Sequence, residues 1–265
     1  MYRMIATTTL IFASAALIWA DDANNFQWQG EMTPGQLLSI RAINGSVNAS
    51  LAPGTQASIT VVKSGIRDDP SQVQIQVVPY DGGIVVCAVY PPFFSSQPNT
   101  CNAPGIQSTQ NVGSDVQVQF TVLVPAGVSL NVQNVNGDIH AGGLNSDIQA
   151  TTVNGQVTLS TSGAGQAATV NGSIVGSFGS TDWSGRHAFS TVNGSVDVTI
   201  PAASNVVVQA STVHGTVSSD FPLGVQNSSG FVCGVGGSAN GTIGNGGGTI
   251  SLSSVNGSVH LRKGQ

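Results

Sequence analysis

Two carboxylates, Asp138 and Asp147, lie nine residues apart and are the first candidates for acid–base chemistry. A glycosidase needs one carboxyl group as proton donor and a second as base or nucleophile, held at a defined separation. Aspartates are much commoner in turns and corners, where the carboxylate accepts hydrogen bonds from nearby backbone N–H groups. We therefore expect structural roles for Asp138 and Asp147 and no catalytic residues among the twelve acidic side chains.

The four histidines, His140, His187, His214 and His260, are the candidates for metal binding. His140 and His260 each follow an Asn-Gly pair at the same offset, but they lie far apart along the chain. A metal site needs several ligands within coordination distance, and neither the histidines nor the three cysteines have zinc-site spacing. The sequence therefore predicts surface histidines, with no metal and no cofactor.

Other enzymatic signatures are missing from the sequence. Asp68-Asp69 precedes a proline and is most simply a turn, although two adjacent carboxylates also suit calcium. Polysaccharide lyases built on a β-helix use Arg or Lys beside bound calcium, but only three basic residues follow position 134 (Arg186, Arg262 and Lys263). The chain has no G-x-S-x-G elbow, and its glycine tract lacks the Lys and Ser/Thr of a phosphate loop. We expect a protein that is not an enzyme.

A recurring motif, V-N-G-x-V/I, indicates which strands and turns would position these residues. One copy has His in place of Asn, and an early copy begins with Ile. Successive centres from Asn136 are 18, 17, 22 and 21 residues apart, and the last interval of 42 has room for a degenerate coil at Asn240-Gly241. The predicted repeat corners are Asn44, Gly45, Asn136, Gly137, Asn154, Gly155, Asn171, Gly172, Asn193, Gly194, His214, Gly215, Asn256 and Gly257. A period near 20 residues is typical of a repeat architecture.

Asn-Gly is a strong turn signal, so the corners could close independent hairpins of an up-and-down sheet. That alternative does not explain why the same turn returns at a fixed period. A single-stranded β-solenoid (β-helix) with coils of about 20 residues explains it, because Val and Ile on either side of each corner would stack on their equivalents in neighbouring coils. Asn side chains would then form an amide ladder, beside a second column of Thr or Ser two residues earlier. The sequence predicts an all-β solenoid domain over residues 126–265.

Residues 21–125 show a different pattern. Four runs are strand-like (Ala57–Lys63, Gln72–Val78, Ile84–Tyr90 and Asp115–Val124). Gln72–Val78 and Asp115–Val124 alternate apolar with polar residues, as strands with one solvent-exposed face do. The four runs predict a small antiparallel sheet or sandwich that precedes the solenoid, with Pro125-Ala126-Gly127 between the two.

Residues 1–20 have the features of a signal peptide, with Arg3 before an apolar stretch and small residues before Asp21. Cleavage after Ala20 or Ala16 fits this pattern, and no later stretch is long enough to span a membrane. Removing residues 1–20 takes away one basic residue and changes the formal charge from −5 to −6. Because nucleic-acid binding needs a clustered basic face, we expect no nucleic-acid partner. The chain is expected to be exported, to the periplasm or the cell surface.

In an exported chain, Cys87 and Cys101 are the natural disulfide pair, and Cys233 is left over. Between the paired cysteines, Tyr90, Phe93 and Phe94 form the best candidate for a partner-binding loop, since exposed adjacent aromatics often mark binding patches. The alternative is that this apolar loop caps the open end of the solenoid.

Four phrases taken together resemble the bacterial putative adhesin family, a domain family of unknown function. They are T-V-N-G-S-V, V-P-A-G-V-x-L at Val124–Leu130, D-F-P-L at Asp220–Leu223, and the closing S-V-N-G-S-V-H-L-R-K. The likeness covers about residues 28–263 and is strongest from Val124 onward. It implies an exported β-solenoid and carries over no catalytic residues. His214 and the long interval after Val217 depart from the pattern.

Three functions follow as alternatives. The first is a non-enzymatic adhesin or envelope structural module that binds a surface ligand, either a glycan or an envelope protein. The second is a carbohydrate-active enzyme, a polysaccharide lyase or hydrolase, on a β-helix; paired acidic and basic residues on adjacent coils would favour it. The third is a periplasmic scaffold or sensing domain.

Overall fold

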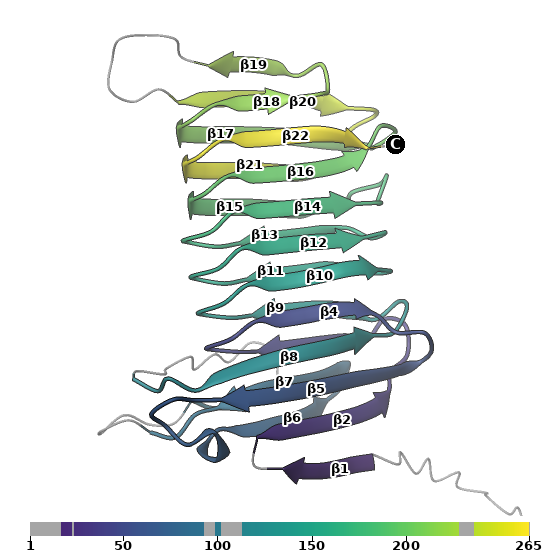
Figure 1. Ribbon diagram of the computed structural model, residues 1–265. Coiled ribbons are helices and arrows are strands. Elements are labelled where there is room, and N and C mark those ends of the chain that lie inside the picture. Colours follow the sequence, from purple (N-terminus) through teal and green to yellow (C-terminus); the bar gives the residue numbers. More distant parts are fainter. Residues whose placement is uncertain (1–16, 23, 93–98, 102–112, 228–235, 265) are drawn as a thin grey trace, which may run out of the picture.

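A computed structural model of the chain describes residues 17–22, 24–92, 99–101, 113–227 and 236–264. These residues form two 11-stranded sheets and one 3-10 turn, η1 (Pro70–Gln72), and they contain no α-helix. Strands of both sheets lie across the long axis of the molecule, stacked one above another (Figure 1). The predicted all-β class is confirmed, in the form of two large mixed sheets that do not close on each other.

Sheet A has a parallel central part and an antiparallel end formed by β1, β2, β5 and β8. Its strands, in spatial order, are β1 (Leu17–Asp22), β2 (Asn25–Glu31), β5 (Gln56–Ser64), β8 (Gln117–Val124), β4 (Val47–Leu51), β10 (Ile139–Leu144), β12 (Val157–Thr161), β14 (Ile174–Phe178), β16 (Val196–Pro201), β22 (Val259–Gly264) and β18 (Val217–Ser219).

Sheet B is parallel in its centre and has one antiparallel partner strand or more at each end. Its strands, in spatial order, are β19 (Gly224–Asn227), β20 (Gly237–Ile243), β17 (Val206–His214), β21 (Gly248–Asn256), β15 (Arg186–Asn193), β13 (Gly165–Ala168), β11 (Ile148–Thr151), β9 (Ser129–Gln133), β3 (Leu37–Arg41), β7 (Gly83–Val89) and β6 (Gln74–Tyr80).

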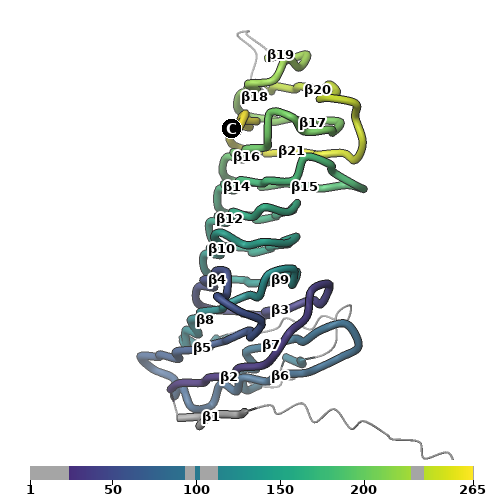
Figure 2. The backbone as a smooth tube through the Cα atoms, turned by 90° about the vertical axis from the view of Figure 1, so that its right-hand side faces the viewer, coloured from purple at the N-terminus to yellow at the C-terminus, as the bar shows by residue number. Residues whose placement is uncertain are grey.

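The repeat places consecutive strands in opposite sheets. From β9 to β18 the chain alternates between sheet B and sheet A, and each Asn-Gly corner carries it from B to A. Figure 2 shows the two sheets as two layers next to each other, joined by the connections between consecutive strands. Within each sheet the repeat strands pair in parallel, for example Ile139 with Val157 and Val157 with Ile174. One repeat therefore adds one rung to each sheet.

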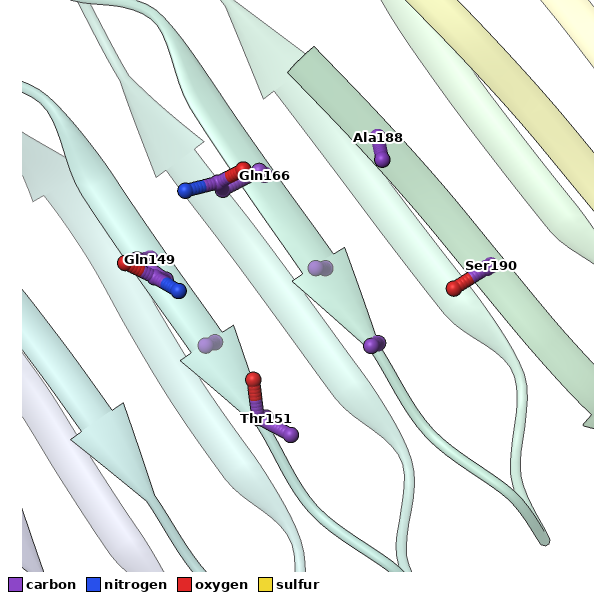
Figure 3. A pocket seen from close by; sticks show the side chains of 8 residues that line it. Gln149, Thr151, Gln166, Ala188 and Ser190 are labelled. Carbon is purple, nitrogen blue, oxygen red and sulfur yellow. The ribbon is translucent and has the colours of Figure 1, made fainter. Parts of the chain in front are cut away.

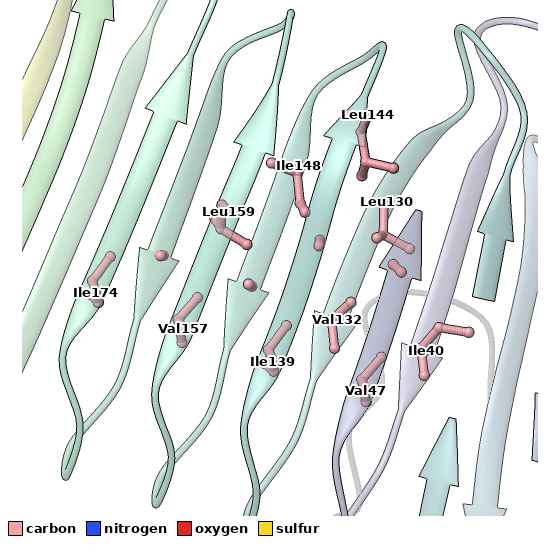
Figure 4. Packing of buried hydrophobic residues seen from close by; sticks show 14 of the residues in the cluster. Ile40, Val47, Leu130, Val132, Ile139, Leu144, Ile148, Val157, Leu159 and Ile174 are labelled. Atoms are coloured by element: carbon pink, nitrogen blue, oxygen red, sulfur yellow. The ribbon is translucent and has the colours of Figure 1, made fainter. Parts of the chain in front are cut away.

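The core lies between the sheets and is built from the same repeat positions in each rung. The aliphatic residue after each Asn-Gly-x is fully buried, as at Val47, Ile139 and Val157 (Figure 4). Leu130 and Ile148 of sheet B lie in the same hydrophobic cluster. Because strand side chains alternate between faces, the intervening residues point outward. This alternation gives each sheet one apolar face and one solvent face.

The strands predicted before residue 125 coincide closely with β5, β6, β7 and β8. They pair antiparallel as β5 with β8 and β6 with β7, but the two pairs lie in different sheets. Each pair is joined in parallel to a rung of the stack, β8 to β4 and β7 to β3. Both sheets thus run without a break across the boundary predicted between residues 125 and 126.

The last coil of the chain does not occupy the last place in the stack. β22 lies between β16 and β18 in sheet A, and β21 lies between β15 and β17 in sheet B. The last interval had room for a degenerate coil at Asn240-Gly241, but these residues lie inside β20, which pairs antiparallel with β17. The interval of 42 residues is a detour through β19 and β20, after which the chain returns to fill a place between earlier coils.

At the N-terminal end, β1 pairs antiparallel with β2 and includes the predicted cleavage position after Ala20, whereas Ala16 lies outside the described residues. Among the described residues, no helix is both long and apolar enough to cross a membrane.

Candidate functional site

The predicted corners form an amide ladder along the stack. From Asn136 onward, each corner Asn donates a side-chain hydrogen bond to the Oδ1 atom of the Asn in the neighbouring rung, whereas Asn44 donates to the carbonyl of Ser114. The donor–acceptor distances are 2.7–2.8 Å along the series Asn136–Asn44, Asn154–Asn136, Asn171–Asn154, Asn193–Asn171 and Asn256–Asn193. His214 pairs with Asn256 in the backbone register and stands beyond the last Asn. These amides are engaged with each other and act as structural groups.

The column two residues before each Asn is buried and hydrogen-bonded. The hydroxyls of Thr152, Thr169 and Thr191 donate to the carbonyl oxygens of Gly137, Gly155 and Gly172 in the adjacent rungs, at 2.8–3.2 Å. The carbonyl of Gly137 also accepts from the side-chain amide of Asn134 at 3.1 Å. A buried polar group without a partner is costly, so a short hydroxyl side chain suits this position.

The aliphatic residues on the two sides of the corner have different environments. Those after the corner lie in the core, whereas Val153, Val170, Val192 and Val255 before it are each 38–39% exposed. The aliphatic residues on the two sides of the corners therefore form two separate stripes, one in the core and one at the surface. Strand alternation explains the difference, because the buried Thr occupies the inward position and turns the next residue outward.

The predicted loop between the paired cysteines is only partly described. Cys87 and Cys101 form a disulfide, and Phe93, Phe94 and Cys233 lie outside the described residues. Tyr90 is 1% exposed, and its hydroxyl donates to the carbonyl of Val116 at 3.1 Å. Burial raises the pKa of this hydroxyl. Tyr90 anchors the start of the loop and does not present its ring to a partner.

The candidate carboxylates serve the backbone. Asp138 accepts from the N–H of Gln156 at 2.8 Å and Asp147 from the N–H of Ala164 at 2.9 Å. They lie beyond opposite ends of β10, so they do not form a pair on one face. Asp69 accepts from the N–H of Ser71, which lowers its pKa. Within the described ranges, no three His, Cys, Asp or Glu side chains form a group able to hold a metal ion.

Rung order brings together a polar cluster on sheet A that the sequence did not reveal. Asp197, His260 and Ser218 follow their corner aliphatic residues at the same offset and occupy neighbouring rungs, β16, β22 and β18. Ser218 Oγ lies 2.5 Å from His260 Nδ1. Arg262 donates to both oxygens of Asp197, at 2.6–2.9 Å. The shared offset was visible in the sequence, but the insertion of β22 between β16 and β18 was not.

The remaining histidines do not meet this cluster. His140 lies on the same face of sheet A but four rungs away from His260, because β12, β14 and β16 separate β10 from β22. His187 lies on sheet B, with its ring against Trp183 and its Nε2 2.9 Å from the carbonyl oxygen of Ser184.

Part of the outer face of sheet B, beside Arg186 of β15, is uncharged and is called here the amide face. It consists of two adjacent columns that run from β9 to β20. One column is Asn131, Gln149, Gln166, Ala188, Ser251, Gln209 and Asn240; the other is Gln133, Thr151, Ala168, Ser190, Ser253, Ser211 and Ser238. None of these residues is ionisable. Small side chains at Ala168 and Ala188 leave a shallow hollow of about 90 Å³, bordered by Gln149, Gln166 and Ser190 (Figure 3).

No family model matches this chain, and no curated protein matches it significantly. Among solved structures, it is similar to a putative cell adhesion protein from Clostridium sporogenes, with 11% sequence identity and a TM-score of 0.46, over 91% of this chain and 100% of that one. It is also similar to a putative adhesin from Bacteroides fragilis, with 12% identity and a TM-score of 0.26, over 91% of this chain and 98% of that one.

Proposed function

We propose that this chain is an exported, non-enzymatic β-solenoid that binds a surface ligand, as an adhesin or an envelope binding module. The solenoid rests on the repeat region, where each repeat adds one parallel strand to each sheet and consecutive corner asparagines are bridged to each other. The two sheets are then the two broad sides of one flattened coil.

One contrast carries the binding function. The corner asparagines use their amides on each other. Among the described residues, by contrast, no side-chain hydrogen bond engages the amides of Gln149, Gln166 or Gln209, which lie on the broad face of sheet B. A flat row of unengaged polar groups is suited to contact a ligand, whereas the candidate carboxylates Asp138 and Asp147 are bonded to backbone N–H groups.

Export is supported by the leader-like residues 1–20 and by the Cys87–Cys101 disulfide. Disulfides persist in oxidising compartments such as the periplasm and the cell exterior, and they are rare in the cytosol.

A second function, a carbohydrate-active enzyme, is favoured by the polar cluster on sheet A. Ser218 and His260 lie within the distance at which a base takes a proton from a nucleophile. Asp197 is bound through both oxygens to Arg262 and is not free to orient the histidine as the third member of a triad does. The cluster resembles the paired acidic and basic residues expected of an enzyme, but its members satisfy each other.

Screening the purified chain on a glycan array, with product formation measured on every retained glycan, separates the two functions. We expect retention without turnover. Product formation that disappears in Ser218→Ala or His260→Gln would overturn the binding function and support the enzyme. The matched control is Ser160→Ala, since Ser160 is exposed on sheet A but lies outside the cluster.

A further inference from the structure

We propose that the amide face of sheet B binds an extended, neutral glycan laid across the rungs, with the hollow at Ala168 and Ala188 as its central contact. This inference rests on the proposed binding function and names its ligand class and its surface. Four features of the face support it.

The first feature is charge. Both columns of the amide face are free of ionisable side chains from β9 to β20. Two single arginines border them, Arg41 beside Gln133 in the next rung and Arg186 two residues before Ala188 on β15, and they do not form a basic cluster. Nucleic acids and acidic polysaccharides are bound through clustered Lys and Arg, so a neutral ligand fits this surface. Uncharged polyhydroxyl chains meet that requirement.

The second feature is the supply of hydrogen-bonding groups. A glutamine amide donates through its nitrogen and accepts through its oxygen, which matches a sugar hydroxyl that does both. Gln149 and Gln166 lie on adjacent rungs and border the hollow (Figure 3). Rungs are about 4.8 Å apart, which is comparable to the length of one pyranose unit in an extended chain. Successive sugars can therefore meet equivalent groups on successive rungs.

The third feature is a pair of unsatisfied acceptors on β9, the rung beside Gln149. Asn131 Oδ1 and Gln133 Oε1 are both shielded from water and lack a hydrogen-bond partner. A buried acceptor without a partner is destabilising. Turning either side chain toward a ligand hydroxyl would relieve this cost, so the β9 end of the face gains from being occupied.

The fourth feature is the floor of the hollow. Ala168 and Ala188 have no polar side-chain atoms and no bulk, so the ring face of a sugar can approach the sheet there. The two columns of the amide face contain no aromatic side chain, whereas aromatic residues contribute much of the binding energy in protein–protein interfaces. A protein partner is thus disfavoured, and affinity for a glycan should accumulate over several sugar units.

Calorimetric titration with neutral hexasaccharides (β-1,4-glucan, β-1,3-glucan, xylan and chitin fragments) tests the proposal, with oligogalacturonate as the acidic comparison. We expect at least one neutral hexasaccharide to bind, its disaccharide to bind much more weakly, and oligogalacturonate not to bind. Because no ion pairs are involved, affinity should stay constant between about 0.05 and about 0.5 M salt.

Two variants locate the site. Gln149→Ala combined with Gln166→Ala should weaken binding by about 10- to 100-fold, the loss expected for two to three hydrogen bonds. Ala168→Lys should abolish binding by filling the hollow. The matched control is Thr158→Ala with Ser160→Ala on the outer side of sheet A, which should leave the affinity unchanged, and circular dichroism should show all variants folded.

The outcomes separate this inference from the proposed function. If a neutral glycan binds equally well to the double glutamine variant, or if only oligogalacturonate binds, the amide face is not the site and the binding function stands. If a glycan is bound and converted to product, the non-enzymatic function itself fails. If no oligosaccharide binds, the glycan proposal is overturned, and a protein ligand is then the remaining form of the binding function.

Discussion

The side-chain amide of Asn256 donates to Oδ1 of Asn193 at 2.8 Å, although the two residues are 63 positions apart. His214, which precedes Asn256 in the chain, lies on the other side of Asn256 in the backbone register. The final coil thus inserts between two earlier coils, and the corner that carries His214 lies at the end of the ladder. An imidazole at that position has an Asn neighbour in the ladder on one side only, so the change of residue falls where the ladder ends.

The amide ladder should stabilise the stack in proportion to the number of bonds each Asn makes. Asn154 makes two ladder bonds, one to Asn136 and one from Asn171, whereas Asn256 makes one. We expect Asn154→Ala to lower the free energy of unfolding by roughly 1–2 kcal/mol and Asn256→Ala by about half as much. Denaturant unfolding followed by circular dichroism measures both. Equal losses would mean that turn preference, and not the ladder, makes Asn favourable at the corner.

The buried Thr column should be more sensitive than any exposed Thr. The hydroxyl of Thr169 donates to the carbonyl of Gly155 at 3.0 Å, and Thr169 is 5% exposed. Thr169→Val keeps the shape but leaves that carbonyl without its side-chain donor, so we expect a loss of about 1–3 kcal/mol. Thr121→Val on the exposed face of β8 is the control and should change stability by less than about 0.5 kcal/mol. A stabilised Thr169→Val protein would refute this role.

The corner glycines should be intolerant of any side chain. A Cβ atom at Gly172 would lie 1.9 Å from the backbone carbonyl oxygen of Gly155 in the adjacent rung, which cannot rotate away as a flexible side chain could. Gly172→Ala is expected to cost at least about 3 kcal/mol, because relief requires the rungs to separate. At Gly54 nothing lies within 4 Å of such an atom, so Gly54→Ala should be nearly neutral. Thermal unfolding of the two variants compares a packed glycine with a free one.

The local sequence predicted much of this architecture. The Asn-Gly corners, the Thr column and the strands before residue 125 follow from turn preference and from alternation, both of which operate over a few residues. The place of each strand in the stack does not follow from local pattern. Nothing near Val259 specifies that β22 pairs with β16 and β18, because that choice depends on contacts such as Arg262 with Asp197 across 65 residues.

The candidate sites show the same limit. The offset shared by Asp197, Ser218 and His260 is visible in the sequence, but their proximity depends on rung order. The amide face was likewise hidden, since its columns collect one outward residue from each of many strands. Tyr90 was a candidate for a partner-binding loop, with a cap as the alternative; it follows the end of β7 and packs inward, and its burial depends on contacts with residues distant in the sequence, such as its hydrogen bond to the carbonyl of Val116.

Near the N-terminal end of the stack, hydrogen bonds accepted by the carboxylate of Asp115 should make the stability of the fold depend on pH. Asp68 and Asp115 each accept a hydrogen bond from the backbone N–H of the other, and Asp115 also accepts from the N–H of Arg67. These backbone bonds, with a smaller effect of the Arg67 side chain, lower the pKa of Asp115 below its ordinary value. A carboxyl group whose pKa is lower in the folded state stabilises that state above its unfolded pKa, which is about 3.9. The stabilisation is lost as pH falls through the lower folded value.

Asp115→Asn removes this titration, so we expect its stability to decline less steeply than that of the unchanged protein as pH falls from about 5 to about 2. Denaturant unfolding at a series of pH values provides the comparison. Arg67→Met is the matched control, because it keeps the backbone N–H that Asp115 accepts from and removes only an exposed side-chain contact of 3.3 Å. Exposed ion pairs contribute little, so this variant should retain most of the acid dependence. If Arg67→Met reduced the pH dependence of stability as much as Asp115→Asn, the ion pair would be the main cause of the lowered pKa of Asp115. The hydrogen bonds from the backbone N–H groups would then not be the main cause.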